Sequence, residues 1–340
     1  MRSSLASESE LSPPVSDLRA RYTLSHAVRA PNIQELFAPE QATGASMVDP
    51  CSASNIGSGP LDSNREQNCY DLGIQPGFVS SADFGTRTEL QGGNTQLNPE
   101  KADTYTVGLV YTPSNNFSLA LDYWDVEIKD AITTYNPTFI LNSCVDGQSI
   151  NPLFCDLINR NEQGQILNVR TQSINVAAFV ASGVDMDVNY SIDLAEFGDL
   201  NFNLNATYLD ERKFFNNLAD PTDKQSLAGQ VGSPHLRALL NTVYRIHDLT
   251  ANWSLNYIGE STFNKEASDE TYEDWFDNSV GSYSYHNLNL NYALNDQFSL
   301  YAGIDNVTDK RPPALPNLNA GSLLYDGVGR KYYLGLRYKL

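Results

Sequence analysis

Positive charge is scarce in this sequence. Its 340 residues contain 22 Lys and Arg against 41 Asp and Glu, which gives a formal net charge of −19. Proteins that bind nucleic acid need clustered Lys and Arg to displace counterions from the phosphates. The composition therefore argues against a nucleic-acid partner, but not against a membrane partner.

Long apolar runs are also missing. No stretch approaches the roughly 18 residues of a transmembrane helix. Residues 1–17 contain no apolar segment typical of a secretory signal. The hydrophobic fraction of 41% lies below the roughly 45–50% of a soluble globular domain. These absences exclude a helical membrane protein and predict an unusually wet core.

Catalytic motifs are absent as well. The sequence has no G-x-S-x-G, no H-E-x-x-H, no phosphate-binding glycine loop and no Cys with a plausible base partner. The four His residues lie on separate predicted strands or turns: His26, His235, His247 and His286. We therefore predict that the protein is not an enzyme and needs neither a cofactor nor a metal.

What the sequence does contain is a strict alternation of apolar and polar residues. From Leu200 to Tyr208 every second residue is apolar, and Asn or Thr lies between them. The same pattern returns over 287–294, 298–305 and 331–340. A period of two indicates a strand with one apolar and one polar face.

The whole chain can be divided into ten such strands, near 18–28, 101–112, 117–130, 176–192, 199–211, 233–247, 249–263, 281–294, 297–307 and 328–340. The connections at 113–116, 193–198, 248 and 295–296 are short. Those at 29–100, 131–175, 212–232, 264–280 and 308–327 are long. Alternation of short and long connections predicts an antiparallel up-and-down meander.

Three architectures use such strands: a soluble sandwich, a soluble ligand barrel and a membrane barrel. The predicted strands exceed the roughly 5–6 residues common in globular sheets and suit a tilted bilayer crossing of about 9–11 residues. The second face carries polar residues that cannot pack a dry core, while the first ends in Tyr or Trp. We predict an all-β transmembrane barrel with short periplasmic turns and long extracellular loops.

Four segments carry specific motifs: R-A-P-N-I-Q-E-L-F at 29–37, G-N-T-Q-L-N-P-E at 93–100, D-N-V-T-D-K at 305–310 with Pro312, and G-R-K-Y-Y-L-G-L at 329–336. In this order they resemble segments of the TonB-dependent outer-membrane receptors, and the resemblance covers almost all of residues 18–340. It implies structural roles for Arg29, Pro31, Glu35, Leu36, Phe37, Asn94, Pro99, Glu100, Asp305, Asn306, Asp309 and Arg330. The last residue, Leu340, departs from the usual Phe but stays apolar.

The resemblance also implies what surrounds this segment. Family barrels have about 22 strands and a plugged lumen, whereas ten strands are predicted here. We expect a non-barrel or truncated leader or junction over 1–17 and the C-terminal half of a receptor barrel over 18–340, with no plug domain. Such a half should not close alone, because its two exposed strand edges are costly in lipid.

Function follows from the resemblance as an expectation. The family imports large scarce solutes, such as an iron–siderophore complex, a cobalamin or an oligosaccharide, across the bacterial outer membrane. Its partners are outer-membrane lipid and lipopolysaccharide, the plug domain, the TonB protein and the solute. The alternatives are a passive porin-like or structural barrel without TonB, and a soluble carbohydrate-binding β protein.

The four cysteines form two local pairs in the long loops, Cys51 with Cys69 and Cys144 with Cys155. An even count, the loop location and an oxidising cell-surface context favour two disulfides. A zinc site would need closer spacing or histidine partners. Cysteines at similar loop positions of many relatives agree with the disulfides.

Acidic and aromatic residues are concentrated at 267–277. The candidate ligand contacts in this loop are Asp269, Glu270, Tyr272, Glu273, Asp274 and Trp275. The alternative is a solvated, repulsive surface loop, which is the usual role of a charge run. Calcium bound by Asp269, Glu270 and Glu273 is a further hypothesis, although the spacing is not that of an EF-hand.

Overall fold

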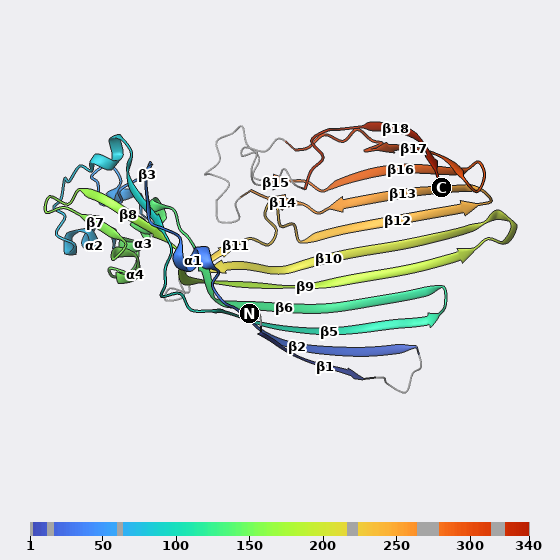
Figure 1. The fold of residues 1–340 in the computed structure, drawn as a ribbon, viewed down its shortest axis with the longest axis horizontal. Helices are drawn as coiled ribbons and strands as arrows, with labels where there is room; N and C mark the ends of the chain where they lie inside the picture. The colour runs from blue at the N-terminus through green and yellow to red at the C-terminus, as the bar shows by residue number, and fades with distance from the viewer. Residues whose placement is uncertain are drawn as a thin grey trace.

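A large antiparallel sheet dominates the computed structural model, which describes residues 3–11, 17–59, 64–215, 224–263, 279–313 and 324–339. Its strands follow one another in chain order from β1 to β18 (Figure 1). They are β1 Ser3–Leu11, β2 Leu18–Arg29, β5 Glu100–Ser114, β6 Phe117–Thr133, β9 Ile174–Asp193, β10 Asp199–Phe215, β12 Leu236–Ile246, β13 Leu249–Ile258, β16 Tyr283–Ala293, β17 Phe298–Asp305 and β18 Lys331–Tyr338. The short β11, Lys224–Ser226, pairs with β10.

The ten predicted strands all occur in this sheet, which is an open, partial barrel. Strands β1 and β18 form its two edges. The sequence analysis did not predict β1, whose backbone pairs with β2 from Ser3↔Val28 to Leu11↔Ala20. A strand edge offers main-chain hydrogen bonds whatever the side chains, so residues without clear alternation can also pair there. The division of the chain at residue 17 stays a prediction.

Several predicted boundaries are wrong in detail, and two of them change the connections between strands. Strand β13 ends at Ile258 rather than 263, and the short β14, Ser261–Thr262, follows it and pairs with β15, Ser279–Val280. The connection between β16 and β17 occupies residues 294–297 rather than 295–296. The Asn295 side chain accepts hydrogen bonds from the backbone N–H groups of Gln297 and Phe298, both at 2.9 Å. This cap stabilises a longer turn than the sequence predicts.

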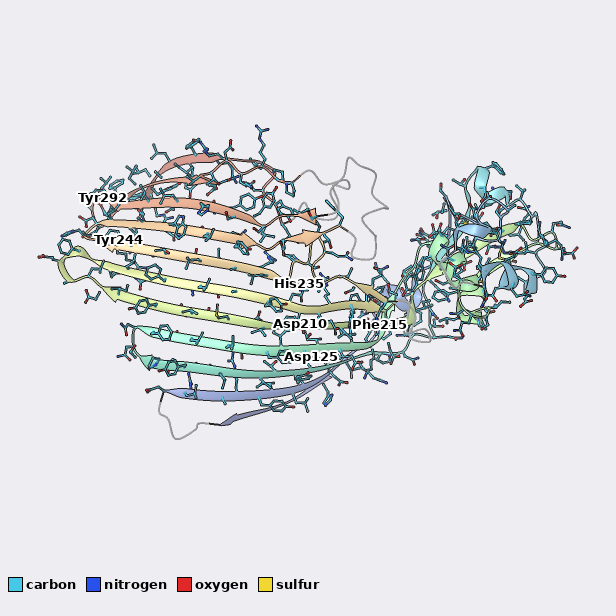
Figure 2. All side chains as sticks on the ribbon, turned by 180° about the vertical axis from the view of Figure 1, so that it is seen from behind. Asp125, Asp210, Phe215, His235, Tyr244 and Tyr292 are labelled. Atoms are coloured by element: carbon cyan, nitrogen blue, oxygen red, sulfur yellow. A yellow bond between two sulfur atoms is a disulfide. The ribbon has the colours of Figure 1, made fainter. Side chains whose placement is uncertain are left out.

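The outer face of the sheet is an apolar band between two rows of aromatic residues. On β5 the exposed row runs Tyr105, Val107, Leu109 and Tyr111. Aromatic residues are spaced by the same six residues on β6 (117, 123), β10 (202, 208) and β18 (332, 338). Six residues span about 20 Å of strand, close to the apolar band of about 25 Å in transmembrane barrels. In Figure 2, Tyr244 and Tyr292 lie at the turn end of the sheet, away from Asp125 and Asp210.

The inner face carries neutral hydrogen-bonding groups in register. One cross-strand row runs over six strands, from β6 to β16, through Ser118, Asn189, Asn203, Asn241, Ser254 and Asn287. Within it the Asn203 amide donates to the Asn189 side-chain oxygen at 2.7 Å. Such a face suits a hydrated lumen rather than a dry core, as the alternation predicted.

Tyrosines cover glycines on the inner face of the last two strands. Gly303 lies opposite Tyr333, and Gly335 lies opposite Tyr301. A methyl group added at either glycine would lie 2.3 Å from the tyrosine ring or hydroxyl that covers it. These glycines therefore leave room for the two rings to lie flat against the neighbouring strand.

The long loops 30–99 and 131–173 fold together beyond one end of the sheet, and we call this unit the two-loop module (Figure 1). Its four-stranded sheet has the order β3 (Gln41–Ala45), β4 (Arg87–Gly92), β8 (Ile166–Gln172) and β7 (Ile158–Arg160). Strand β4 of the first loop pairs in parallel with β8 of the second. The helices are α1 Ile33–Phe37, α2 Arg65–Asp71, α3 Pro137–Val145 and α4 Pro152–Cys155. Short 3₁₀ helices lie at Ile56–Ser58 and Ser81–Phe84, and one in a sheet turn at Ala195–Phe197.

The main dry core of the described chain lies in this module rather than in the large sheet. Its fully buried members include Ile140, Leu141, Phe154 and Val169, which come from α3, α4 and β8. Met47 and Ile74 add side chains from the first loop. No helix among the described residues is long and apolar enough to cross a membrane.

Candidate functional site

Three motif residues meet where the two-loop module joins the sheet. Arg29, at the end of β2, donates from Nη1 to both Glu35 oxygens at 3.1 and 3.2 Å. Its Nη2 donates to Glu100 Oε1 at 2.8 Å, and its Nε also donates to Glu100. Glu100 in turn accepts from the Ile132 backbone N–H at 2.8 Å. One guanidinium thus connects β2, α1 and β5, and Glu100 adds the end of β6. We call this cluster the neck.

The neck lies outside the membrane-spanning part of the sheet. Glu100 precedes Tyr105, the outer aromatic residue of β5, by five residues, or about 16 Å of strand. The hydrogen bonds from Arg29 hold the pKa of the Glu100 carboxyl below its ordinary value, against the opposing effect of burial. Glu100 is therefore a charged partner of Arg29 at neutral pH.

The second motif packs directly against the first. The Gly93 N–H donates to the Ala38 carbonyl at 2.9 Å, and the Asn94 N–H donates to the Glu35 carbonyl at 2.7 Å. A Cβ atom at Gly93 would lie 2.6 Å from the Ala38 nitrogen. Asn94 also donates from its side chain to the Ser173 carbonyl at 2.9 Å, which brings in the second loop. Two motifs nearly sixty residues apart therefore form one unit.

The exposed side of that unit is partly apolar. Phe37 is 65% exposed and Ile33, one turn away on α1, is 79% exposed. Leu36 and Pro31 are half-buried, whereas Pro99 is exposed. Ile33 and Phe37 therefore present apolar side chains at the surface of α1.

The third and fourth motifs form a second structural unit at the end of β17. Asn306 adopts a positive φ of 51° and is 1% exposed. Its side chain accepts from the Lys310 N–H at 2.8 Å and donates to the Lys310 carbonyl at 3.0 Å. The Asp309 carboxylate accepts from the Arg330 N–H at 3.0 Å, and Lys331 lies 3.6 Å from Asp305. These contacts join the end of β17 to the start of β18.

Both predicted disulfides are present, each within one loop of the module. The Cα atoms are 5.6 Å apart in Cys51–Cys69 and 4.8 Å apart in Cys144–Cys155. Three of the four cysteines are fully buried in the module core. Each disulfide therefore cross-links residues of a single loop, and other contacts must join one loop to the other.

Two buried ion pairs join the loops. Arg160 donates to both Asp49 oxygens at 2.7 and 2.8 Å, and the Asp49 side chain is 0% exposed. Arg65 donates to both Asp146 oxygens, with Nη2 at 2.7 Å. Bidentate pairs of this kind fix both distance and orientation. Sequence reasoning missed them, because nothing local selects one partner for an arginine among 41 acidic residues.

A cavity of about 570 Å³ opens beside α2. Its lining includes Glu66, Gln67 and Tyr70 from the exposed side of the helix, with Ile74 and the Cys51–Cys69 disulfide beneath. Over the described part of the chain, no three His, Cys, Asp or Glu side chains lie close enough together to hold a metal ion.

Some predicted site residues lie outside the described residues. They are Leu340 and the six candidates of the acidic loop, Asp269, Glu270, Tyr272, Glu273, Asp274 and Trp275. Their ligand and calcium roles stay predictions.

The family model described as TonB dependent receptor-like, beta-barrel, matches residues 10–307, which is most of the chain. The chain belongs to the TonB-dependent receptor family. The resemblance inferred from the four motifs is thus confirmed. Members of this family are transport receptors of the Gram-negative outer membrane and not enzymes. No curated protein sequence matches this TonB-dependent receptor chain.

Solved structures similar to this receptor chain share its fold. The ferric enterobactin receptor PfeA of Pseudomonas aeruginosa, in complex with enterobactin, has a TM-score of 0.60 and 14% identity and covers 98% of the chain. The siderophore receptor PirA of Acinetobacter baumannii has a TM-score of 0.59 and 18% identity and covers 96%. The copper transporter OprC has a TM-score of 0.53 and 15% identity and covers 98%.

The receptor chain spans only part of each of these structures. It covers 40% of the PfeA chain, 40% of the PirA chain and 38% of the OprC chain. At these identities the likeness concerns the fold alone. The open edges at β1 and β18 agree with a partial barrel.

Proposed function

We propose that this chain forms barrel wall and surface loops of an outer-membrane receptor for active uptake of a large scarce solute. The candidate solutes are an iron–siderophore complex, a cobalamin or an oligosaccharide. The observation that carries the proposal is the match of residues 10–307 to the receptor barrel family. The apolar outer band, the hydrated inner face and the structured loops at one end suit that role.

The partners follow from the same proposal. Outer-membrane lipid and lipopolysaccharide contact the apolar band and the aromatic rows that bound it. A plug domain fills the lumen of the complete receptor, and TonB of the inner-membrane complex acts on that plug. The described chain supplies the surface loops that meet the solute first.

The passive porin-like barrel has no observation of its own in its favour. The match of residues 10–307 to the receptor barrel family favours the receptor instead. The soluble carbohydrate-binding protein fits poorly, because a continuous exposed apolar band is costly in water.

TonB dependence separates the proposal from the passive alternative. We would express the complete reading frame that contains these residues in a Gram-negative host and isolate the outer membrane by density. We expect the protein in that fraction, with solute uptake that is lost when the tonB gene is deleted. Uptake that persists at the same rate without TonB would contradict active transport and favour the passive barrel.

A further inference from the structure

The two-loop module is poor in positive charge. Its residues 30–99 and 131–173 include four arginines, no lysine and eleven Asp and Glu. A surface of this sign raises the local concentration of cations and repels anions before any contact is made. The module therefore favours a solute with a cationic group on electrostatic grounds.

The four arginines of the module are already occupied. Arg65 and Arg160 form the two buried pairs that join the loops, and Arg170 lies 3.4 Å from Glu40. Arg87 donates to the Thr86 carbonyl at 2.8 Å and to the Ser81 hydroxyl at 3.2 Å. An anionic solute would have to displace one of these partners. For Arg65 and Arg160, whose side chains are largely buried, loss of the partner is strongly destabilising.

The cavity beside α2 has groups that suit a cation rather than an anion. Glu66 is exposed, lines the cavity, and makes no hydrogen bond or ion pair with the described residues. Tyr70, one turn further along α2, is 53% exposed and presents an aromatic ring. Gln67 and Gln75 add carboxamide oxygens, and Ile74 gives an apolar floor. At about 570 Å³ the cavity lies within the range of roughly 300–1,000 Å³ typical of small-molecule sites.

We propose that this cavity binds a cationic group of the transported solute, with Glu66 as its counter-ion and the Tyr70 ring against it. A carboxylate and an aromatic face together recognise an ammonium group by charge and by cation–π attraction. The scaffold is rigid because the Cys51–Cys69 disulfide lies under the cavity and Arg65 anchors α2 to Asp146. This assignment rests on the proposed function and narrows its solute class.

The test compares two iron complexes that differ in one charge. Ferrioxamine B carries a free ammonium group, and its N-acetylated derivative is neutral. The complete receptor that contains these residues is purified in detergent, and binding of each complex is measured by titration calorimetry at low and high salt. We expect the ammonium complex to bind about tenfold more tightly at low salt, and the difference to shrink as salt rises.

Two variants test whether Glu66 and Tyr70 are responsible for the preference for the ammonium complex. Glu66→Gln should remove the preference for the ammonium complex, and Tyr70→Leu should reduce it several-fold. The control Glu162→Gln removes an exposed carboxylate of the same module in the turn between β7 and β8 and should leave the preference unchanged. All three positions are exposed, so the variants should fold like the parent chain.

Several results would overturn the assignment. They are equal affinity for the two complexes, absence of binding for both, tighter binding of the anionic complex ferric enterobactin, or an unchanged preference in Glu66→Gln. None of these would affect outer-membrane location or TonB dependence. The solute-charge inference and the proposed function therefore fail separately.

Discussion

The packing and hydrogen bonds of single residues explain why the family motifs contain these residue types. Gly93 is needed because backbone atoms of Leu36 and Ala38 lie against it. Asn94 and Arg29 both form hydrogen bonds to Glu35 in the same segment. Asn306 is needed because its turn takes a positive φ and its amide bonds both backbone groups of Lys310. The sequence located these residues, but only the structure shows which partner each one holds.

Substitution of Gly93 by Ala should destabilise the neck. The added methyl would lie within 2.7 Å of backbone atoms of Leu36 and Ala38, and overpacking against backbone costs roughly 1–3 kcal/mol. Thermal unfolding should show a lower midpoint for Gly93→Ala. Gly57→Ala is the matched control, because nothing lies within 4 Å of that position. Equal midpoints for the two variants would contradict the packing argument.

Glu100→Gln should weaken the neck and change its response to acid. A hydrogen bond to a charged group contributes roughly 1.5–3 kcal/mol. Because the folded-state pKa of Glu100 is lowered, its contribution is fully present above the unfolded pKa of about 4.3. The contribution is lost as pH falls through the folded-state value.

Unfolding free energies measured between neutral and acidic pH test this linkage. The parent chain should lose more stability on acidification than Glu100→Gln, so the two curves should converge at low pH. Parallel curves would show that Arg29 and Glu100 are not coupled. Glu162→Gln, at an exposed turn position, serves as the control.

At the scale of elements, the two loops form one body although each has its own disulfide. Strands β4 and β8 pair in parallel, and parallel neighbours are always joined by long connections. The buried pairs Asp49–Arg160 and Arg65–Asp146 connect the same two loops. Each of these two long connections thus forms half of a packed module.

Asp49→Asn should destabilise the two-loop module much more than the loss of an exposed ion pair does. Loss of one partner of a buried pair costs roughly 3–5 kcal/mol, and Asp49 is fully buried. Glu40→Gln removes the partner of Arg170, where both side chains are about half exposed, and should cost under about 1 kcal/mol. Limited proteolysis of the folded chain measures the cleavage rate of the module in each of the two variants. Equal cleavage rates in the two variants would contradict a role for Asp49 in joining the loops.

For the whole molecule, the decisive feature is an open sheet with an apolar outer face. Its central strands have neighbours on both sides, whereas β1 and β18 each have one. The exposed row of β18 comprises Tyr332, Leu334, Leu336 and Tyr338. Exposed edges of this kind pair readily with further strands.

Hydrogen-exchange rates of the chain in detergent should depend on whether a strand is central or at an edge of the sheet. Backbone amides of β9 and β10 should exchange most slowly, because both of their sides are hydrogen bonded within the sheet. Amides of β1 and β18 should exchange fastest among the long strands. Strong protection of both edges would show that they pair with each other or with a second copy.

The sequence by itself determined ten strands of the large sheet, their two faces, the disulfides and the family. These properties are local: alternation with period two sets a strand and its faces, and each motif or cysteine pair lies within a short segment. The tertiary structure decided that two distant loops share a core, that Arg160 selects Asp49, and that α2 borders a cavity. The ion pairs between the two loops join residues 81 and 111 positions apart, and periodicity carries no information about which distant segments meet.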